Sequence, residues 1–179
     1  MRFASLCVPV LLLFASCSTK QPTTRSELTG VYRAARSIDG ALAVGVSYGD
    51  FSTLVREFSG ELLVARDQIR FDPQANGAVL PVLDKYAEML AMYKDSEQVW
   101  GFEIRQEKYN DALPVLAVKY GVAGAVYDRK DSTYGITSTS RNVNYESIRQ
   151  AIWKKASDIH EHQLAAVYGQ PIAVAFTKN

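Results

Sequence analysis

Residues 41 to 58 have the sequence "ALAVGVSYGDFSTLVREF", and the fold of the whole chain depends on how this stretch folds. The apolar run before Gly45 fits either a buried strand or the end of a helix, because short apolar runs are ambiguous by periodicity alone. The run after Asp50 is helical, with apolar residues three and four positions apart. A strand here would begin an α/β fold, whereas a helix would begin a helical bundle.

The apolar spacing on both sides favours the bundle. The helical pattern starts at Ser26 and continues beyond the turn, so Gly45 and Gly49 mark a bend at 46–50, and Asp50 is placed to cap the second helix. Ser47 is then a turn residue. The apolar faces of the two predicted helices are Leu28, Val31/Tyr32, Ala35, Ile38, Leu42 and Val46, and Phe51, Leu54/Val55, Phe58, Leu62, Ala65 and Ile69.

Two further helices are predicted, at about 78–107 and 145–168, the first of them after the turn sequence "FDPQANG" (71–77). Long helices joined by short turns favour antiparallel neighbours. The sequence therefore predicts an all-α domain over 26–169, a bundle of four to five helices with a long irregular loop before the last helix, and a C-terminal tail at 170–179.

The region 108–144 is rich in Gly, Ser, Thr, Asn and Asp and is expected to be that loop. Two alternatives stay open within it: a short helix in "LPVLAVKYG", and a hairpin formed by "AGAVYD" and "YGITSTS". Tyrosine contributes contact area at low entropic cost. We therefore expect four exposed tyrosines here to form a binding surface: Tyr109, Tyr120, Tyr127 and Tyr134.

The N-terminus has the pattern of an export signal. Met1-Arg2 precedes the apolar stretch 6–15, which is too short to span a bilayer, since that takes about 20 residues. The stretch ends in Phe14-Ala15-Ser16-Cys17, which resembles the lipobox of bacterial lipoproteins. An ordinary secretory signal, with Cys17 incidental, is the alternative. Residues 1–16 are then the signal peptide and 17–25 a polar, flexible tether.

The resemblance implies a lipid anchor on Cys17 and a place in the bacterial cell envelope, as in small uncharacterised helical envelope lipoproteins. Ser18 after the cysteine resembles the outer-membrane sorting signal, which implies an outer-membrane protein facing the periplasm. The expected partners are the membrane, through Cys17, and an unknown envelope protein. Cys7, the other cysteine, lies inside the signal peptide, so the mature chain has no thiol for a disulfide or a metal.

Charge argues against nucleic acid as a partner. The chain has 20 Lys and Arg against 19 Asp and Glu, and loss of Arg2 with the signal peptide leaves 19 of each. No basic patch or charged block stands out along the sequence.

Gly45-Val-Ser47-Tyr-Gly49 matches the G-x-S-x-G nucleophile elbow, so a small serine hydrolase is the rival interpretation. That motif needs a strand before the serine and neighbouring parallel strands. The approximately 25 mature residues before the apolar run at 41–46 are a tether followed by a helical pattern, which leaves no room for neighbouring strands. The histidine that the mechanism needs could only be His160 or His162, inside a helical stretch.

His160 and His162 are expected to be solvated imidazoles on a helix surface. Residues two apart on a helix point about 200° from one another, so the two rings cannot bind one ion. No metal or cofactor is predicted. Aromatic residues at helical spacing are expected in the core, and a cavity between helices for an apolar ligand is the alternative: Tyr86, Tyr93, Trp100, Phe102 and Trp153.

These observations together favour a lipid-anchored, non-enzymatic accessory or binding protein that presents the 108–144 region to its partner.

Overall fold

The computed structural model describes residues 28–70, 76–133 and 136–164. The predictions for Cys17, the signal peptide, the tether and the C-terminal tail lie outside these residues. The described elements are the helices α1 (Thr29–Val44), α2 (Tyr48–Arg70), α3 (Asn76–Ile104), α4 (Ala112–Lys119) and α5 (Tyr145–Asp158), a 3-10 turn (Ala123–Ala125), the strands β1 (Val126–Thr133) and β2 (Ile136–Val143), and a π-helical segment (Ile159–Leu164).

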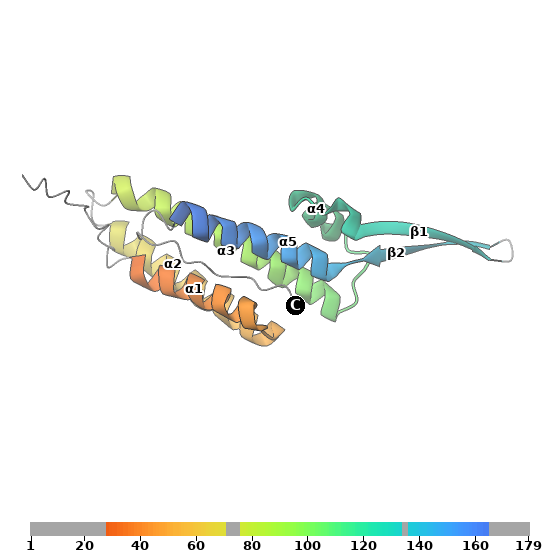
Figure 1. The fold of residues 1–179 in the computed structure, drawn as a ribbon, viewed down its shortest axis with the longest axis horizontal. Helices are drawn as coiled ribbons and strands as arrows, with labels where there is room; N and C mark the ends of the chain where they lie inside the picture. The colour runs from red at the N-terminus through yellow and green to blue at the C-terminus, as the bar shows by residue number, and fades with distance from the viewer. Residues whose placement is uncertain (1–27, 71–75, 134–135, 165–179) are drawn as a thin grey trace, which may run out of the picture.

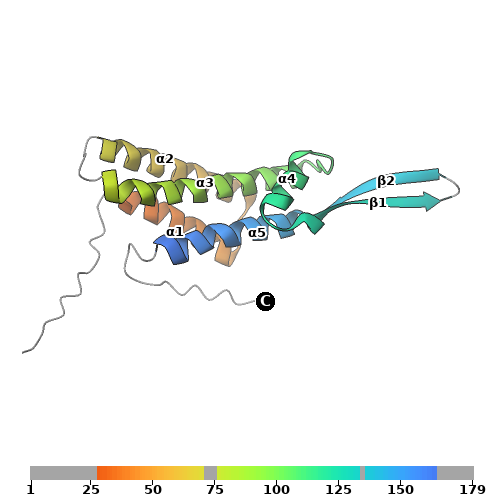
Figure 2. The same ribbon diagram turned by 90° about the horizontal axis from the view of Figure 1, so that it is seen from above.

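Four long helices, α1, α2, α3 and α5, lie side by side and alternate in direction, which confirms the predicted all-α bundle (Figures 1 and 2). α3 packs against both α2 and α5, and α1 packs against α2. The β1–β2 hairpin projects from one end of the bundle. α1 begins, and α5 ends, towards the opposite end. None of the described helices has an apolar stretch long enough to cross a membrane.

Two groups of buried side chains form the core. The larger lies between the long helices, and the apolar face predicted for α2 is buried along its whole length. Phe58 of α2 packs edge-on against Tyr86 and Tyr93 of α3, with ring centroids 6.1 and 6.2 Å apart. The smaller group joins α4 and the hairpin base to the ends of α3 and α5: Val99, Phe102, Leu113, Leu116, Ala117, Tyr120, Ala125, Tyr145, Ile148 and Ile152.

The turn between α1 and α2 covers residues 45–47, slightly before the predicted 46–50, and a different residue caps α2. Gly45 has φ +90°, which ends α1. Ser47, and not Asp50, is the N-cap of α2: its Oγ accepts the Asp50 N–H at 3.2 Å, and its carbonyl accepts the Phe51 N–H at 2.9 Å. The Asp50 carboxylate in turn accepts the Ser47 hydroxyl proton at 2.7 Å. The predicted assignment was wrong by three residues because both residue types cap helices.

The region 108–144 is more ordered than the irregular loop that we expected, and both alternatives left open there are present. α4 occupies the first, and Gly121 follows it with φ +78°. The hairpin occupies the second, with Val126 opposite Val143 and Thr133 opposite Ile136 in an antiparallel register. Its residues are mostly polar and do not alternate, so they gave only a weak strand pattern.

The last helix changes from α to π geometry within its predicted range. α5 ends at Asp158, and the backbone widens into the π-helical segment over 159–164. Residues 165–168, the end of the predicted helix, lie outside the described part of the chain. Single π-helical turns often occur at functional positions in helices, and this one carries His160.

Candidate functional site

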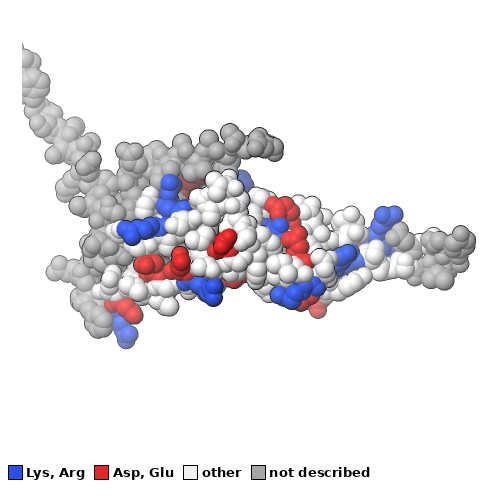
Figure 3. Space-filling view, turned by 90° about the horizontal axis from the view of Figure 1, so that it is seen from below, with Lys and Arg blue, Asp and Glu red and all other residues white. Residues whose placement is uncertain are grey.

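Exposed large apolar side chains are most frequent near the end of the molecule that carries the hairpin. Nine large apolar or aromatic residues in the described segments are exposed, and five of these lie within residues 104–127, which lead from the end of α3 through α4 into β1. Elsewhere on the bundle, acidic and basic residues are interspersed on the face that Figure 3 shows. We call these five residues the distal patch: Ile104, Tyr109, Val115, Val118 and Tyr127.

The base of the hairpin is firmly attached to the bundle. Val126 and Val143 pack against the smaller core group. The Asn144 N–H donates to the Ala125 carbonyl at 2.7 Å, which extends the ladder by one pair. The Asn144 side chain then accepts the Ser147 N–H at 2.9 Å and caps α5. One residue therefore ends the hairpin and begins the last helix, which fixes the direction in which the hairpin leaves the bundle.

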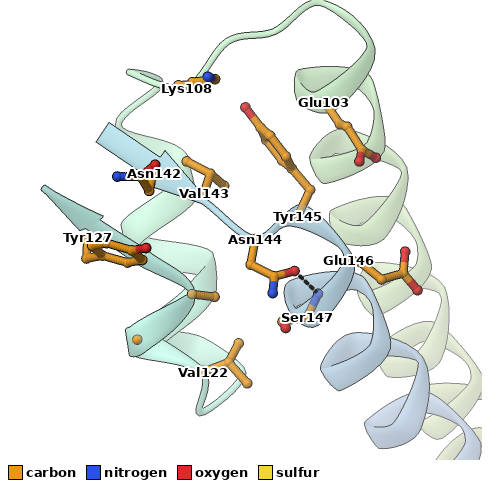
Figure 4. Close-up of a pocket in the computed structure, with 12 residues that line it drawn as sticks. Glu103, Lys108, Val122, Tyr127, Asn142, Val143, Asn144, Tyr145, Glu146 and Ser147 are labelled. Carbon is orange, nitrogen blue, oxygen red and sulfur yellow. Dashed lines mark hydrogen bonds between the residues drawn. The ribbon is translucent and has the colours of Figure 1, made fainter. Parts of the chain in front are cut away.

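An open pocket of about 750 Å³ lies between the hairpin base and the ends of α3 and α5. Figure 4 shows Tyr127 and Asn142 on the hairpin side and Glu103 and Glu146 on the helix side. Its wall is mixed in chemistry and includes Lys108 and several amide and hydroxyl groups. This lining can donate and accept hydrogen bonds.

Tyr145 stands in the middle of this pocket wall (Figure 4). It is 7 % exposed, and its hydroxyl is buried with no hydrogen-bond partner. Burial, followed by the charges of Glu103 and Glu107, raises the pKa of Tyr145. Its phenol therefore stays protonated at neutral pH.

Arg149 lies behind the pocket and joins α5 to α3. It is 6 % exposed, and its guanidinium pairs with Glu103 and Glu146 and lies over the Trp100 ring, 4.7 Å from the centroid. A buried charge is tolerated only when it is paired in this way. Burial opposes ionisation of Glu146, but hydrogen bonds from Gln150 and Arg149 outweigh it, so the pKa of Glu146 is lowered.

Tyr109 of the distal patch touches the hairpin directly. Its hydroxyl accepts the Arg141 N–H at 3.4 Å, and the Arg141 guanidinium lies 5.6 Å from the centroid of its ring. Arg141 also pairs with Asp128 across the hairpin at 2.9 Å. The loop between α3 and α4 therefore contacts the edge of β2 at Arg141 through Tyr109.

The four predicted binding tyrosines divide into three groups. Tyr109 and Tyr127 are 64 % and 57 % exposed, as expected for a surface. Tyr120 is buried at 5 %, so its predicted exposure is wrong: it ends α4, and its hydroxyl donates to Asp95 at 2.6 Å. Burial and this hydrogen bond raise its pKa. Tyr134 lies outside the described residues.

His160 is also placed differently from the prediction. Instead of a solvated imidazole it is a core residue, 5 % exposed, and its Nδ1 lies 2.6 Å from Asp39 Oδ2. The other oxygen of Asp39 accepts the Tyr93 hydroxyl at 2.8 Å. This cluster joins α1, α3 and the π-helical segment. His160 Nε2 is buried without a partner, and the side chain of His162 is outside the described part.

The structure does not join Ser47 to His160. The Ser47 hydroxyl hydrogen-bonds to Asp50 at the start of α2. His160, in the π-helical segment after α5, hydrogen-bonds to Asp39 of α1. A helix, α1, precedes Ser47 where a nucleophile elbow has a strand. In the described segments, no three His, Cys, Asp or Glu side chains are grouped so as to hold a metal ion.

Comparisons with protein-family models, with curated proteins and with solved structures found no match to this chain.

Proposed function

We propose that this chain is a lipid-anchored envelope protein of the binding type, without enzymatic activity, which presents its 108–144 region to a partner protein. The proposed anchor is the lipid on Cys17, and Ser18 after it favours the outer membrane, with the domain in the periplasm. The observation that carries the proposal is the position of the distal patch and the hairpin at one end of the bundle.

The direction of the bundle supports this arrangement. Leu28 is eleven residues after Cys17, and α1 begins towards the end opposite to the hairpin (Figure 1). A lipid at Cys17 therefore attaches the chain at the end of the bundle opposite to the hairpin, and it leaves the hairpin end available for contacts. α3 alone has 29 residues, which is about 44 Å at 1.5 Å per residue.

The chemistry of the hairpin end also supports binding. Exposed aromatic and apolar residues concentrated at one end of a molecule are typical of protein interfaces. Tyr127 and Tyr109 are attached to a firmly packed base, so little conformational entropy is lost when they are covered. A two-stranded ribbon also exposes the backbone groups of its edges, to which an extended segment can add.

Photo-cross-linking tests the proposal. A benzophenone amino acid replaces Tyr109 or Tyr127 in the full chain in living cells, and a matched control carries it at Gln68, an exposed residue near the far end of α2. We expect the Tyr109 and Tyr127 positions to give the same discrete cross-linked band, and the Gln68 position to lack it. Equal cross-linking from all three positions, or none from the first two, contradicts the proposal.

The anchor is tested separately. Cys17→Ser should release the protein from the membrane fraction and remove the mass of the lipid from the mature chain. A Cys17→Ser form that still fractionates with membranes, beside a wild type of unmodified mass, contradicts the anchor and leaves the cross-linking test unaffected.

A further inference from the structure

The two edges of the hairpin differ, and the difference starts with the backbone. Along a strand, successive N–H groups point to opposite sides. On this chain the Asn144 N–H points inward to Ala125, and the Arg141 N–H points outward to Tyr109. Thr139 and Thr137 are in phase with Arg141, so their N–H and C=O groups lie on the outer edge of β2. In the described segments the sheet has only its two strands, and no third strand covers this edge.

Tyr109 limits how much of that edge is available. Its hydroxyl already accepts the Arg141 N–H. A strand added to β2 can therefore bond to Thr137 and Thr139 without displacing Tyr109. Symmetric antiparallel pairing that uses only these two residues has its two-fold axis at Ser138, so that Thr137 of one copy faces Thr139 of the other.

Charge distinguishes β2 from β1. In a two-fold antiparallel pair, the residue on the axis faces its own copy, and like charges directly opposite are destabilising. β1 contains the consecutive residues Asp128-Arg129-Lys130-Asp131, so an axis at any of these positions opposes identical charges. β2 contains Thr137-Ser138-Thr139-Ser140, which are uncharged. Charged residues on an edge strand commonly prevent it from pairing with another chain. The middle of β2 has no such residues.

We propose that β2 pairs with β2 of a second copy of this chain, antiparallel about Ser138, to form a four-stranded sheet in the order β1-β2-β2-β1. Two-stranded ribbons are marginal in water, and three or more strands are needed for independent stability. Antiparallel pairing also directs the two bundles away from one another, so they do not collide. The pairing goes beyond the function proposed above, since it requires neither the lipid nor the envelope partner.

Disulfide trapping of the full chain in intact cells, with membrane-bound and released protein analysed together, tests the pairing. Ser138→Cys places two cysteines opposite one another across the axis, in a pair without mutual hydrogen bonds, where Cα atoms are about 4.5 Å apart and a disulfide can form. Lys130→Cys, exposed on the other strand, is the matched control, and the parent chain gives the background. We expect Ser138→Cys to give a disulfide-linked dimer that reducing agent converts to monomer. Lys130→Cys should give no dimer above background.

Two proline variants in the Ser138→Cys chain test the edge itself. Thr139 and Lys130 are opposite one another, and both direct their N–H outward, so proline at either position removes no bond of the hairpin. Thr139→Pro should lower the yield of the dimer by at least about fivefold, because each copy loses a donor to the other. Lys130→Pro should leave the yield unchanged. An unchanged thermal midpoint in both variants shows that the bundle is intact.

The remaining outcomes overturn the pairing. They are no dimer from Ser138→Cys, equal trapping from Lys130→Cys, equal effects of the two prolines, or a disulfide that joins the Ser138→Cys chain to a different protein. The last result would mean that a partner segment occupies the edge. The benzophenone cross-links from Tyr127 do not depend on any of these results, so the two proposals can fail separately.

Discussion

A core of buried apolar side chains joins the long helices of the bundle, whereas β1 and β2 are joined by a backbone ladder and by the partly exposed ion pair of Asp128 with Arg141. Phe58 and Leu83 are 0 % exposed, and Asp128 and Arg129 are exposed. Burial of apolar surface is the main source of folding stability. The stability of the bundle is therefore expected not to depend on the hairpin. The hairpin depends on its attachment, and its surface remains available for contacts.

The largest expected effect is in the bundle core. Phe58→Ala removes a ring that packs between Tyr86 and Tyr93, and such truncations cost about 3–5 kcal/mol. The control is Leu63→Ala on the same helix, where the side chain is 63 % exposed and the expected change is below about 0.5 kcal/mol. Chemical denaturation measures both. A loss below about 1 kcal/mol for Phe58→Ala would mean that α2 and α3 are not packed as described.

A smaller effect is expected at the junction of the two regions. Arg149→Ala leaves Glu103 and Glu146 without their shared partner and uncovers Trp100. Because both carboxylates are partly exposed, the expected loss is about 2 kcal/mol, below that for a fully buried pair. Lys154→Ala, which breaks an exposed i,i+4 pair with Asp158, is the control, with about 0.3–0.5 kcal/mol expected. Equal losses would contradict a special role for Arg149.

Alkaline pH should weaken the bundle through Tyr93. Burial, with the charge and hydrogen bond of Asp39, raises the pKa of Tyr93 well above its usual value. The folded state therefore favours the protonated phenol. Its contribution to stability is complete below the unfolded pKa of about 10 and is lost as pH rises beyond it. The denaturation midpoint of the wild type should fall more steeply between pH 9 and pH 11, roughly, than that of Tyr93→Phe. Parallel curves would contradict this.

The smallest effect on stability is expected in the hairpin. The hydrogen bond from Arg141 lowers the pKa of Asp128. Its contribution is therefore present above the unfolded carboxyl pKa and is lost as pH falls through the folded one. Asp128→Asn should leave global unfolding unchanged but speed amide exchange of the inward-pointing N–H groups of β2, with Lys130→Gln as the control. A shift of the global transition would show that the hairpin and the bundle unfold as one unit.

The bundle could be predicted from the sequence because its signal is local and repeated. Of the predicted apolar positions on α2 from Phe51 to Ile69, only Leu54 is half-buried, and the others are buried. The hairpin gave little signal, since β1 and β2 have apolar residues mainly at their ends and their stability comes from pairing and from the attachment at Asn144.

The core position of His160 could not be predicted, because its partner Asp39 is 121 residues away and belongs to another helix. Each of the two residues directly follows an apolar position of a predicted face, Ile159 and Ile38, which is the one signal that the sequence offers. The burial of Tyr120 could not be predicted for a similar reason. Its burial depends on Asp95 of α3, and no spacing within 108–144 indicates that contact.

In the proposed arrangement the bundle is a scaffold, and the hairpin end makes the contacts. Hydrogen–deuterium exchange of the intact protein, in its native membranes and after dilution in detergent, tests this most directly. We predict that amides in the membranes gain protection in 104–143 only, with the strongest gain in β2, while α1, α2 and the first part of α3 exchange equally in both samples. Protection gained along α1 and α2, or no difference at 104–143, would contradict the account.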